Sequence, residues 1–268
     1  STNPANDGGT TEPDKGVRLQ LNPSTDNQIP VLYGSAYFGG NITDAALSSD
    51  YKKMTYCLTL AEVTGEKLST GQQTSYTFNN VYFNNNRVVF KADGYTVDYT
   101  LDASGNQDIS MRDLVKVYFY KGTTPIQPVG KSGTTPASHT VMPGWTAGTH
   151  PMTGLLYAIV EVNYNRDKNV TGLPDCQFHI TSDMTLAGDV LVDYMLSTRY
   201  GAGIDVSEID TSFASLNTFC SAGFTYTNLS GQSTTSIIGI NGIVDPTNTL
   251  LDNREEMAEA ASSWITYD

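Results

Sequence analysis

The sequence is poor in cysteine, histidine and tryptophan, and it lacks a long hydrophobic run. Its 268 residues include 3 cysteines, 3 histidines and 2 tryptophans. Cys57, Cys176 and Cys220 are far apart, odd in number and without a CxxC motif, so we expect buried thiols rather than a disulfide framework or a zinc site. No apolar run approaches the roughly 20 residues that a membrane-spanning helix needs. We therefore expect no membrane segment.

Positive charge is almost missing from the C-terminal third of the chain. The whole sequence has 28 Asp and Glu against 15 Lys and Arg, which gives a net charge of −13. Residues 183–268 hold 12 of these acids, but Arg199 and Arg254 are their only basic residues. Such a surface repels phosphate backbones and excludes stable nucleic-acid binding there. It is either an ordinary solvated surface or a wall that nucleic acid passes without sticking.

Motifs of catalysis and metal binding are also missing. His139 and His150 share one segment, but neither has the HxxxH or HExxH spacing of a helical metal site. Cys176 and His179 are three apart on a predicted strand, so they point to opposite faces. The chain contains no GxSxG motif. We predict no catalytic residue, no metal site and no cofactor, and we expect that the protein is not an enzyme.

Carboxylates are plentiful, but their placement does not favour a glycosidase, which needs two carboxyls facing each other across a cleft. We interpret them as solvated helix faces and helix caps, with Asp205 or Asp210 well placed as an N-cap. The groups are Asp189 with Asp193, then Asp205, Glu208 and Asp210, and finally Glu255, Glu256 and Glu259.

The chain is rich in residues that favour strands and turns, with 16 Tyr, 24 Gly and many Thr, Ser and Asn. Order is expected to begin near 29–40. Two hairpins are predicted, one around the three asparagines of VYFNNNRVVF and one around Asp93-Gly94. The expected hairpins cover 81–90 and 88–101, and further strands are expected at 54–63, 113–120 and 155–164.

Two segments of the first part do not fit this strand pattern. Residues 1–28 are polar and turn-rich, and we expect a flexible arm that orders only against a partner. Residues 121–154 are rich in Gly, Pro and Thr and too long for an ordinary tight connection. We predict that 121–154 is a functional or interface loop.

Helical spacing begins at about residue 183. Leu186, Val190 and Tyr194 fall on one face of a first helix. A second helix is predicted from the spacing of Ile209, Phe213, Leu216 and Cys220, and a third covers 248–265. Short strands are expected near 224–227 and 236–244. The predicted fold class is therefore mainly β with an α+β C-terminal part. Its expected domains are the arm 1–28, a β-rich part at 29–182 and an acidic α+β part at 183–268 that looks cut off before a following strand.

The first helix is followed by Arg199-Tyr200-Gly201-Ala202-Gly203. Glycine loops that hold phosphate precede a helix, where free N–H groups and the positive dipole end meet the anion. Here the glycines follow the helix, so we predict a structural helix-stop motif formed by Arg199, Tyr200, Gly201 and Gly203. We expect Gly201 or Gly203 to be left-handed and Arg199 to lie in the last helical turn. Gly201→Val should then impair assembly, because a β-branched residue disfavours a left-handed cap.

Several stretches resemble, in order, the phage tail tip or central tail hub family that includes the lambda tip attachment protein J. IPVLYGSAYFGG resembles its IPVVYGxxxVGG segment, and MTYCLTLAEVTGE, YTFNNVYFNNNRVV and LYAIVEVNYNRDKNVTGLPDCQFHI resemble later stretches. Ala61-Glu62-Val63 departs from the family's usual Gly-Glu-Ile type of sequence, and residues 1–28 match nothing. IDTSFASLNTFC and INGIVDPTNTLLDNREEMAEAASSWITYD resemble the last segments. The stretch before these last segments resembles the family pattern NPAxhhxDYLTxxRYGxGI, and its matching residues are Asp193, Tyr194, Arg199, Tyr200, Gly201, Gly203 and Ile204.

The resemblance implies a structural virion protein at a bacteriophage tail tip or baseplate, made of β-rich hub domains. It implies a homotrimeric ring that closes the tail tube, serves host attachment and genome ejection, and carries receptor-binding parts further along the chain. The implied partners are the distal tail protein, the tail tube and the tape-measure or other tip proteins. The family has no cofactor in this region. An acidic lumen would let DNA pass without stable binding.

Two other classes of function remain open from the sequence. The tyrosine content and the segment 121–154 are compatible with a secreted carbohydrate-binding or glycan-cleaving β protein. A plain adhesin-like module, which would be a monomer, is the third possibility.

Overall fold

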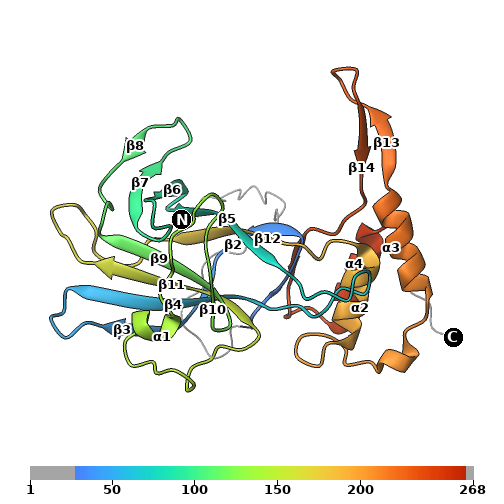
Figure 1. Cartoon of the computed structure of the whole chain (residues 1–268), viewed down its shortest axis with the longest axis horizontal. Helices are drawn as coiled ribbons and strands as arrows, with labels where there is room; N and C mark the ends of the chain where they lie inside the picture. Colours follow the sequence, from blue (N-terminus) through green and yellow to red (C-terminus); the bar gives the residue numbers. More distant parts are fainter. Residues whose placement is uncertain (1–27, 264–268) are drawn as a thin grey trace, which may run out of the picture.

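The computed structural model describes residues 28–263, in which two β-sheets stand beside a group of helices (Figure 1). The predicted arm 1–28 lies outside the described residues, except for Gln28. The described part is rich in strands, and the prediction of a mainly β chain is confirmed. Within residues 28–263, no helix is both long enough and apolar enough to cross a bilayer.

The first sheet has seven strands in the order β10-β9-β11-β4-β1-β15, with β3 paired to β4. Its pairs are antiparallel except for one short parallel contact between β1 and β4. The strands are β1 (Val31–Tyr33), β3 (Asn41–Leu47), β4 (Lys53–Glu62), β9 (Val115–Lys121), β10 (Thr124–Ile126), β11 (Leu155–Asn163) and β15 (Gly242–Val244).

The second sheet has six strands in the order β2-β12-β5-β6-β7-β8. Both predicted hairpins are confirmed here. Asn84 and Asn85 take φ of 48° and 66° in the two-residue turn between β5 and β6, as a primed turn requires. The strands are β2 (Ser35–Phe38), β5 (Tyr76–Phe83), β6 (Asn86–Phe90), β7 (Val97–Leu101), β8 (Gln107–Asp108) and β12 (Cys176–Ser182).

The main core lies between the two sheets and is formed by alternating residues of their strands. Strand β11 is buried on both faces, with Ala158 and Val160 in this core and Tyr157 and Ile159 on the other side. The segment 121–154 accounts for the second face. It contains β10 and the short helix α1 (Ser138–Val141), and it packs buried Val141, Met142 and Trp145 against the sheet. The segment was predicted to be a functional or interface loop. It contains two short elements, and its apolar side chains cover a face of the first sheet.

Helices α2, α3 and α4 gather to the right of the sheets in Figure 1 and enclose a second core. The three predicted helices are present, together with a short 3-10 turn. The strand expected at 236–244 is wrong in its bounds, since one strand ends at Ser236 and the next begins at Gly242. The elements are α2 (Ala187–Leu196), η1 (Val206–Glu208), α3 (Ser212–Ala222), β13 (Phe224–Thr227), β14 (Ser233–Ser236) and α4 (Leu250–Ala260).

Strand β1 belongs to both cores. Leu32 points into the core between the sheets, while Val31 and Tyr33 point into the core of the helices. All three side chains are at most 1% exposed. The alternation of side chains along a strand thus lets three residues fix the helices to the sheets.

Candidate functional site

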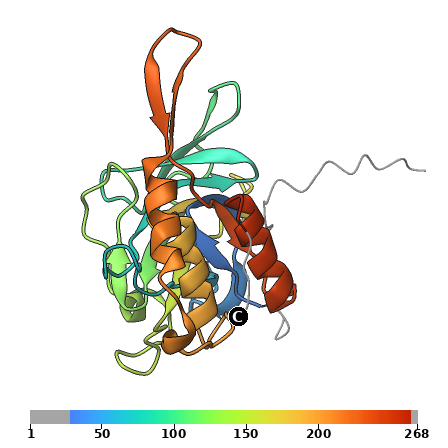
Figure 2. The same cartoon turned by 90° about the vertical axis from the view of Figure 1, so that its right-hand side faces the viewer.

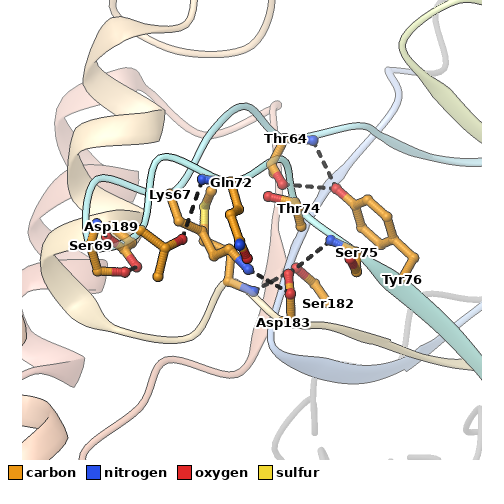
Figure 3. Close-up of polar contacts among 12 residues, drawn as sticks. Thr64, Lys67, Ser69, Gln72, Thr74, Ser75, Tyr76, Ser182, Asp183 and Asp189 are labelled. Atoms are coloured by element: carbon orange, nitrogen blue, oxygen red, sulfur yellow. Dashed lines mark hydrogen bonds and ion pairs between the residues drawn. The ribbon is translucent and has the colours of Figure 1, made fainter.

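Residues 63–75, here called the connecting loop, join β4 to β5 and leave the sheets to lie against α2 (Figure 3). The loop is held at its base by Tyr76, whose hydroxyl accepts a hydrogen bond from the Thr64 amide at 2.8 Å. Further along, its polar groups meet three carboxylates of the helical part, which belong to Asp183, Asp189 and Asp193. We call this set of contacts the carboxylate joint.

Asp193 on α2 is the central acceptor of the joint. Tyr33 of β1 donates its hydroxyl to Oδ2 at 2.7 Å, and the Gly65 amide of the connecting loop donates to Oδ1 at 2.7 Å. Tyr200 donates its hydroxyl to the same carboxylate, at 2.9 Å from Oδ2. Burial raises the pKa of Asp193, and these hydrogen bonds oppose that rise only in part. Its partners among residues 28–263 are uncharged, so there the carboxylate is held by hydrogen bonds.

Asp189 lies one helical turn earlier and is 2% exposed. Ser69 of the connecting loop donates both its amide and its hydroxyl to this carboxylate, each at 2.7 Å. Asn217 of α3 donates its Nδ2 to Asp189 Oδ1 at 2.7 Å and accepts from the Asp189 amide at 3.0 Å. One carboxylate therefore ties α2 to α3 and to the connecting loop.

Asp183 completes the joint just after β12. Lys67 Nζ lies 2.6 Å from its Oδ2, and the Ser75 amide donates to its Oδ1 at 2.8 Å (Figure 3). The Lys67 side chain is 11% exposed and that of Asp183 is 44% exposed. This ion pair is more open to solvent than the two buried carboxylates, so solvent screens it more strongly.

The interpretation of Asp189 and Asp193 as a solvated helix face was wrong. Nine of the ten residues of α2 are buried, so this helix has no face for solvent. The burial of this helix could have been predicted from AGDVLVDYML, which has no charged residue apart from the two acids. A helix that is hydrophobic all round must bury its acids, and buried acids need partners. The loop partners Gly65, Lys67 and Ser69 carried no recognisable sequence signal.

The predicted stop motif folds back beneath the end of α2. The helix ends at Leu196, and three later amides donate hydrogen bonds to carbonyls near its end. Ala202 donates to the Tyr194 carbonyl at 3.1 Å, Gly203 to Ser197 at 3.0 Å and Ile204 to Met195 at 2.9 Å.

Different structural constraints require glycine at the two positions of the motif. Gly203 is left-handed, with φ of 65°, whereas Gly201 does not have a positive φ. A Cβ on Gly201 would lie 1.7 Å from the carbonyl oxygen of Tyr194. The reason first given for Gly201→Val therefore needs correction, because close approach to the helix end, not a left-handed cap, excludes a side chain there.

Arg199 lies beyond the helix and not in its last turn, so that expectation was wrong. Its Nη2 forms an ion pair with Glu62 Oε2 of β4 at 2.7 Å. The guanidinium passes so close to Gly154 that a Cβ there would be 1.7 Å from Nη1. Burial raises the pKa of Glu62, and the Arg199 charge works against that rise. Arg199 is thus a second link between the helical part and the sheets.

The remaining acids and histidines do not gather into a metal site. Within residues 28–263 no group of three or more His, Cys, Asp or Glu side chains is arranged to hold a metal ion. His150 stacks on Trp145, with ring centroids 5.3 Å apart. Asp205 caps η1 by accepting from the Ser207 amide at 2.9 Å, as predicted. The expected burial of Cys57, Cys176 and Cys220 is confirmed.

A second polar group lies on the outer face of the six-stranded sheet. Tyr37 of β2 stacks on His179 of β12, with ring centroids 4.1 Å apart, and Tyr82 of β5 lies 5.9 Å from Tyr37. Ser35 Oγ is 2.9 Å from His179 Nε2. Burial lowers the pKa of His179, which favours the neutral ring. Tyr37 is 41% exposed, so the group offers a flat aromatic surface to solvent.

Comparison with known proteins does not assign the chain to a family. No family model and no curated protein matches it. A chain in the virion of a native gene transfer agent particle is similar over 61% of this chain and 28% of that chain, with 16% sequence identity and a TM-score of 0.31. The present chain thus spans under a third of that virion chain.

Proposed function

We propose that the protein is a structural virion protein without enzymatic activity, located at a bacteriophage tail tip or baseplate. In this proposal it forms a central hub whose homotrimeric ring closes the tail tube. The ring contacts the distal tail protein, the tail tube and tape-measure or other tip proteins, and DNA passes through it without stable binding. Residues 29–182 and the α+β part 183–268 are the two hub domains of each subunit.

One observation carries the proposal. Segments that resemble the tail hub family come from distant parts of the sequence, and residues of these segments contact one another where the helical part meets the sheets. Tyr33 of IPVLYGSAYFGG bonds to Asp193 of the segment ending in RYGAGI, 160 residues away, at 2.7 Å. Glu62 of MTYCLTLAEV pairs with Arg199 of that same segment. The resemblance therefore follows a three-dimensional joint and not only a series of isolated strings.

Only the exposed acids of the C-terminal part support the proposed passage of DNA. Asp189 and Asp193 are buried and cannot line a lumen. The acids of α4 are exposed, as are those around η1, and these keep the C-terminal part strongly acidic. An exposed acidic wall repels the phosphate backbone, which suits passage without adhesion.

The oligomeric state of purified 1–268 tests the proposal most directly. Light scattering over a concentration series, with negative-stain images of the same peak, should show a trimer with a central hole. A monomer up to the highest concentration that stays in solution would contradict a ring built by this chain alone. Asp193→Ala is the matched variant, since loss of the joint should abolish the ring.

The second candidate function is carbohydrate binding, which the stacked group of Tyr37, His179 and Tyr82 favours. Exposed aromatic rings can stack on the apolar faces of sugar rings, and the nearby Ser35 hydroxyl offers a hydrogen-bonding partner. A glycan array with wild type, Tyr37→Ala and Tyr51→Ala tests it. Tyr51 is 78% exposed and lies outside the stacked group, so its loss should not matter. Binding that only Tyr37→Ala removes would favour this function, and polysaccharide cleavage would extend it to an enzyme.

A further inference from the structure

The segment Thr211–Val244 contains no Asp, Glu, Lys, Arg or His, although the chain has a net charge of −13. It comprises α3, the ribbon of β13 and β14, and β15. Copies of an acidic protein repel one another wherever their charged surfaces face. An uncharged surface is therefore where two copies of this chain can approach at least cost.

The β13–β14 ribbon, Phe224–Ser236, projects away from the rest of the molecule (Figures 1 and 2). Within the described residues, its two strands pair only with each other. Phe224 and Tyr226 are 56% and 45% exposed on neighbouring positions of one face, and Leu229 at the tip is fully exposed. An isolated two-stranded ribbon is marginal in water, and exposed apolar side chains on it indicate a contact with another protein surface.

The foot of the ribbon is fixed. A Cβ on Gly223 would lie 2.1 Å from the Ser236 carbonyl oxygen, so the chain crosses itself tightly there. Beyond β14, the Ile238 amide donates to the Cys220 carbonyl at 3.0 Å, and the Ile240 amide donates to the Thr185 carbonyl at 2.8 Å. The ribbon is thus presented in a defined direction, as an element that docks should be.

A shallow apolar groove of about 220 Å³ lies at the opposite end of the helical part. Leu250 and Leu251, at the start of α4, are 47% and 51% exposed at this groove. Exposed acids follow them on α4, among them Asp252 and Glu255, and would repel an acidic segment. The lining residues are Tyr194, Met195, Ala202, Ile204, Leu250, Leu251 and Arg254.

A ribbon cannot fill the groove of its own molecule. Helices α2 and α3 run antiparallel, because the segment 238–240 bonds to both Cys220 and Thr185, and Asp189 bonds to Asn217. The ribbon leaves from the end of α3, beside the start of α2, whereas the groove lies at the end of α2. The ten residues of α2 separate the two by about 15 Å, and the ribbon points away.

We propose that the β13–β14 ribbon of one copy seats its apolar face in this groove of the next copy. The occupant is a second copy because one chain carries both the exposed apolar ribbon and the apolar groove, and within residues 28–263 neither covers the other. The ribbon also lacks the charge that the acids beside the groove would repel. Such a contact joins two different surfaces, so it closes into a ring when the rotation permits. The inference rests on the proposed homotrimer and names the surfaces that build it.

Cysteine cross-linking between two single variants, Leu229→Cys and Leu251→Cys, tests the contact. The native cysteines are 0% exposed and should not react. A mixture of the two variants under mild oxidation should give at least tenfold more covalent dimer than Leu229→Cys mixed with Tyr51→Cys. The double variant should give closed covalent rings. A second measurement is light scattering of Leu229→Asp, which should be monomeric with an unchanged circular dichroism spectrum.

The possible failures are distinguishable. If wild type is a trimer and Leu251→Cys cross-links no better than Tyr51→Cys, the ribbon–groove contact is wrong while the proposed hub stands. If wild type is a monomer and no cross-link forms, both the contact and the ring of this chain are refuted. A trimer that persists in Leu229→Asp also overturns the contact.

Discussion

The connecting loop and the β13–β14 ribbon both extend away from the element they follow, but they differ in the surfaces that contact them. The connecting loop, 63–75, is polar and carries Lys67, and its amides, hydroxyls and ammonium meet the carboxylates of Asp183, Asp189 and Asp193. The β13–β14 ribbon has no charged residue, and its apolar side chains are exposed. The connecting loop has its partners within the chain, whereas the apolar side chains of the ribbon stay exposed among residues 28–263.

The connecting loop and the ribbon differ in the kind of interaction that each can make. Buried hydrogen bonds are directional, so the loop fixes how the helical part sits on the sheets, and each lost partner leaves a buried polar group unsatisfied. Apolar contact is non-directional and needs only a surface to cover. We interpret the loop as a joint inside one subunit and the ribbon as a contact between subunits.

The largest effect is expected from breaking the joint at Asp193. Asp193→Ala leaves the Gly65 amide and the hydroxyls of Tyr33 and Tyr200 without their acceptor. We expect a loss of about 3–5 kcal/mol in the free energy of unfolding, as for other broken buried polar networks. Urea unfolding followed by circular dichroism measures it.

Asp183→Ala is the matched control, because its side chain is 44% exposed and its ion pair with Lys67 is more open to solvent. We expect a loss of about 1 kcal/mol there. Equal losses in the two variants would mean that the buried carboxylate has no special place in the joint.

The next effect separates the two glycines of the stop motif. Gly201→Ala places a methyl group against the Tyr194 carbonyl oxygen and should cost about 3 kcal/mol, because a backbone atom cannot move aside. Gly203→Ala meets nothing closer than 3.6 Å and only forces alanine into a left-handed conformation, which should cost about 1 kcal/mol. Thermal unfolding of the pair decides between close approach and backbone conformation. The reverse order would restore the left-handed cap as the reason.

A third prediction concerns the pH dependence of the joint. The pKa of Asp193 is raised above 3.8 by burial, so this carboxyl binds a proton more readily in the folded state. Its contribution to stability is complete below about pH 3.8 and is lost as pH rises through the folded-state pKa. The stability of wild type minus that of Asp193→Asn should therefore fall as pH rises above about 3.8. A difference that rises with pH would show that the hydrogen bonds outweigh desolvation.

The parts predicted correctly from sequence depend on local patterns. Strands β4 and β11 lie at the expected places because apolar residues repeat within a few positions, and the Asn84-Asn85 turn follows from residues that tolerate positive φ. The carboxylate joint was missed because its partners are distant. Tyr33 and Asp193 are 160 residues apart, and no local pattern in either segment names the other.

The stop motif falls between these cases. The sequence identified the requirement for glycine after α2, since the residues follow an apolar helix. The reason at Gly201 depends on the chain folding back onto the Tyr194 carbonyl, which only tertiary structure supplies. The segment 121–154 is a similar case. Its length was visible in the sequence, but the β11 face that it covers is defined only by the tertiary structure.

The smallest effect is expected at the ribbon, and it completes the comparison. Leu229→Ser should change the free energy of unfolding by no more than about 0.5 kcal/mol at protein concentrations where the chain is monomeric, because Leu229 is fully exposed. Leu191→Ala, in the core of the helices, should cost about 2–5 kcal/mol under the same conditions. A large loss at Leu229 would mean that the ribbon is covered by its own chain, and the distinction between an internal joint and an external contact would fail. A negligible loss in the monomer, together with weaker association at higher concentration, would place the role of the ribbon between subunits.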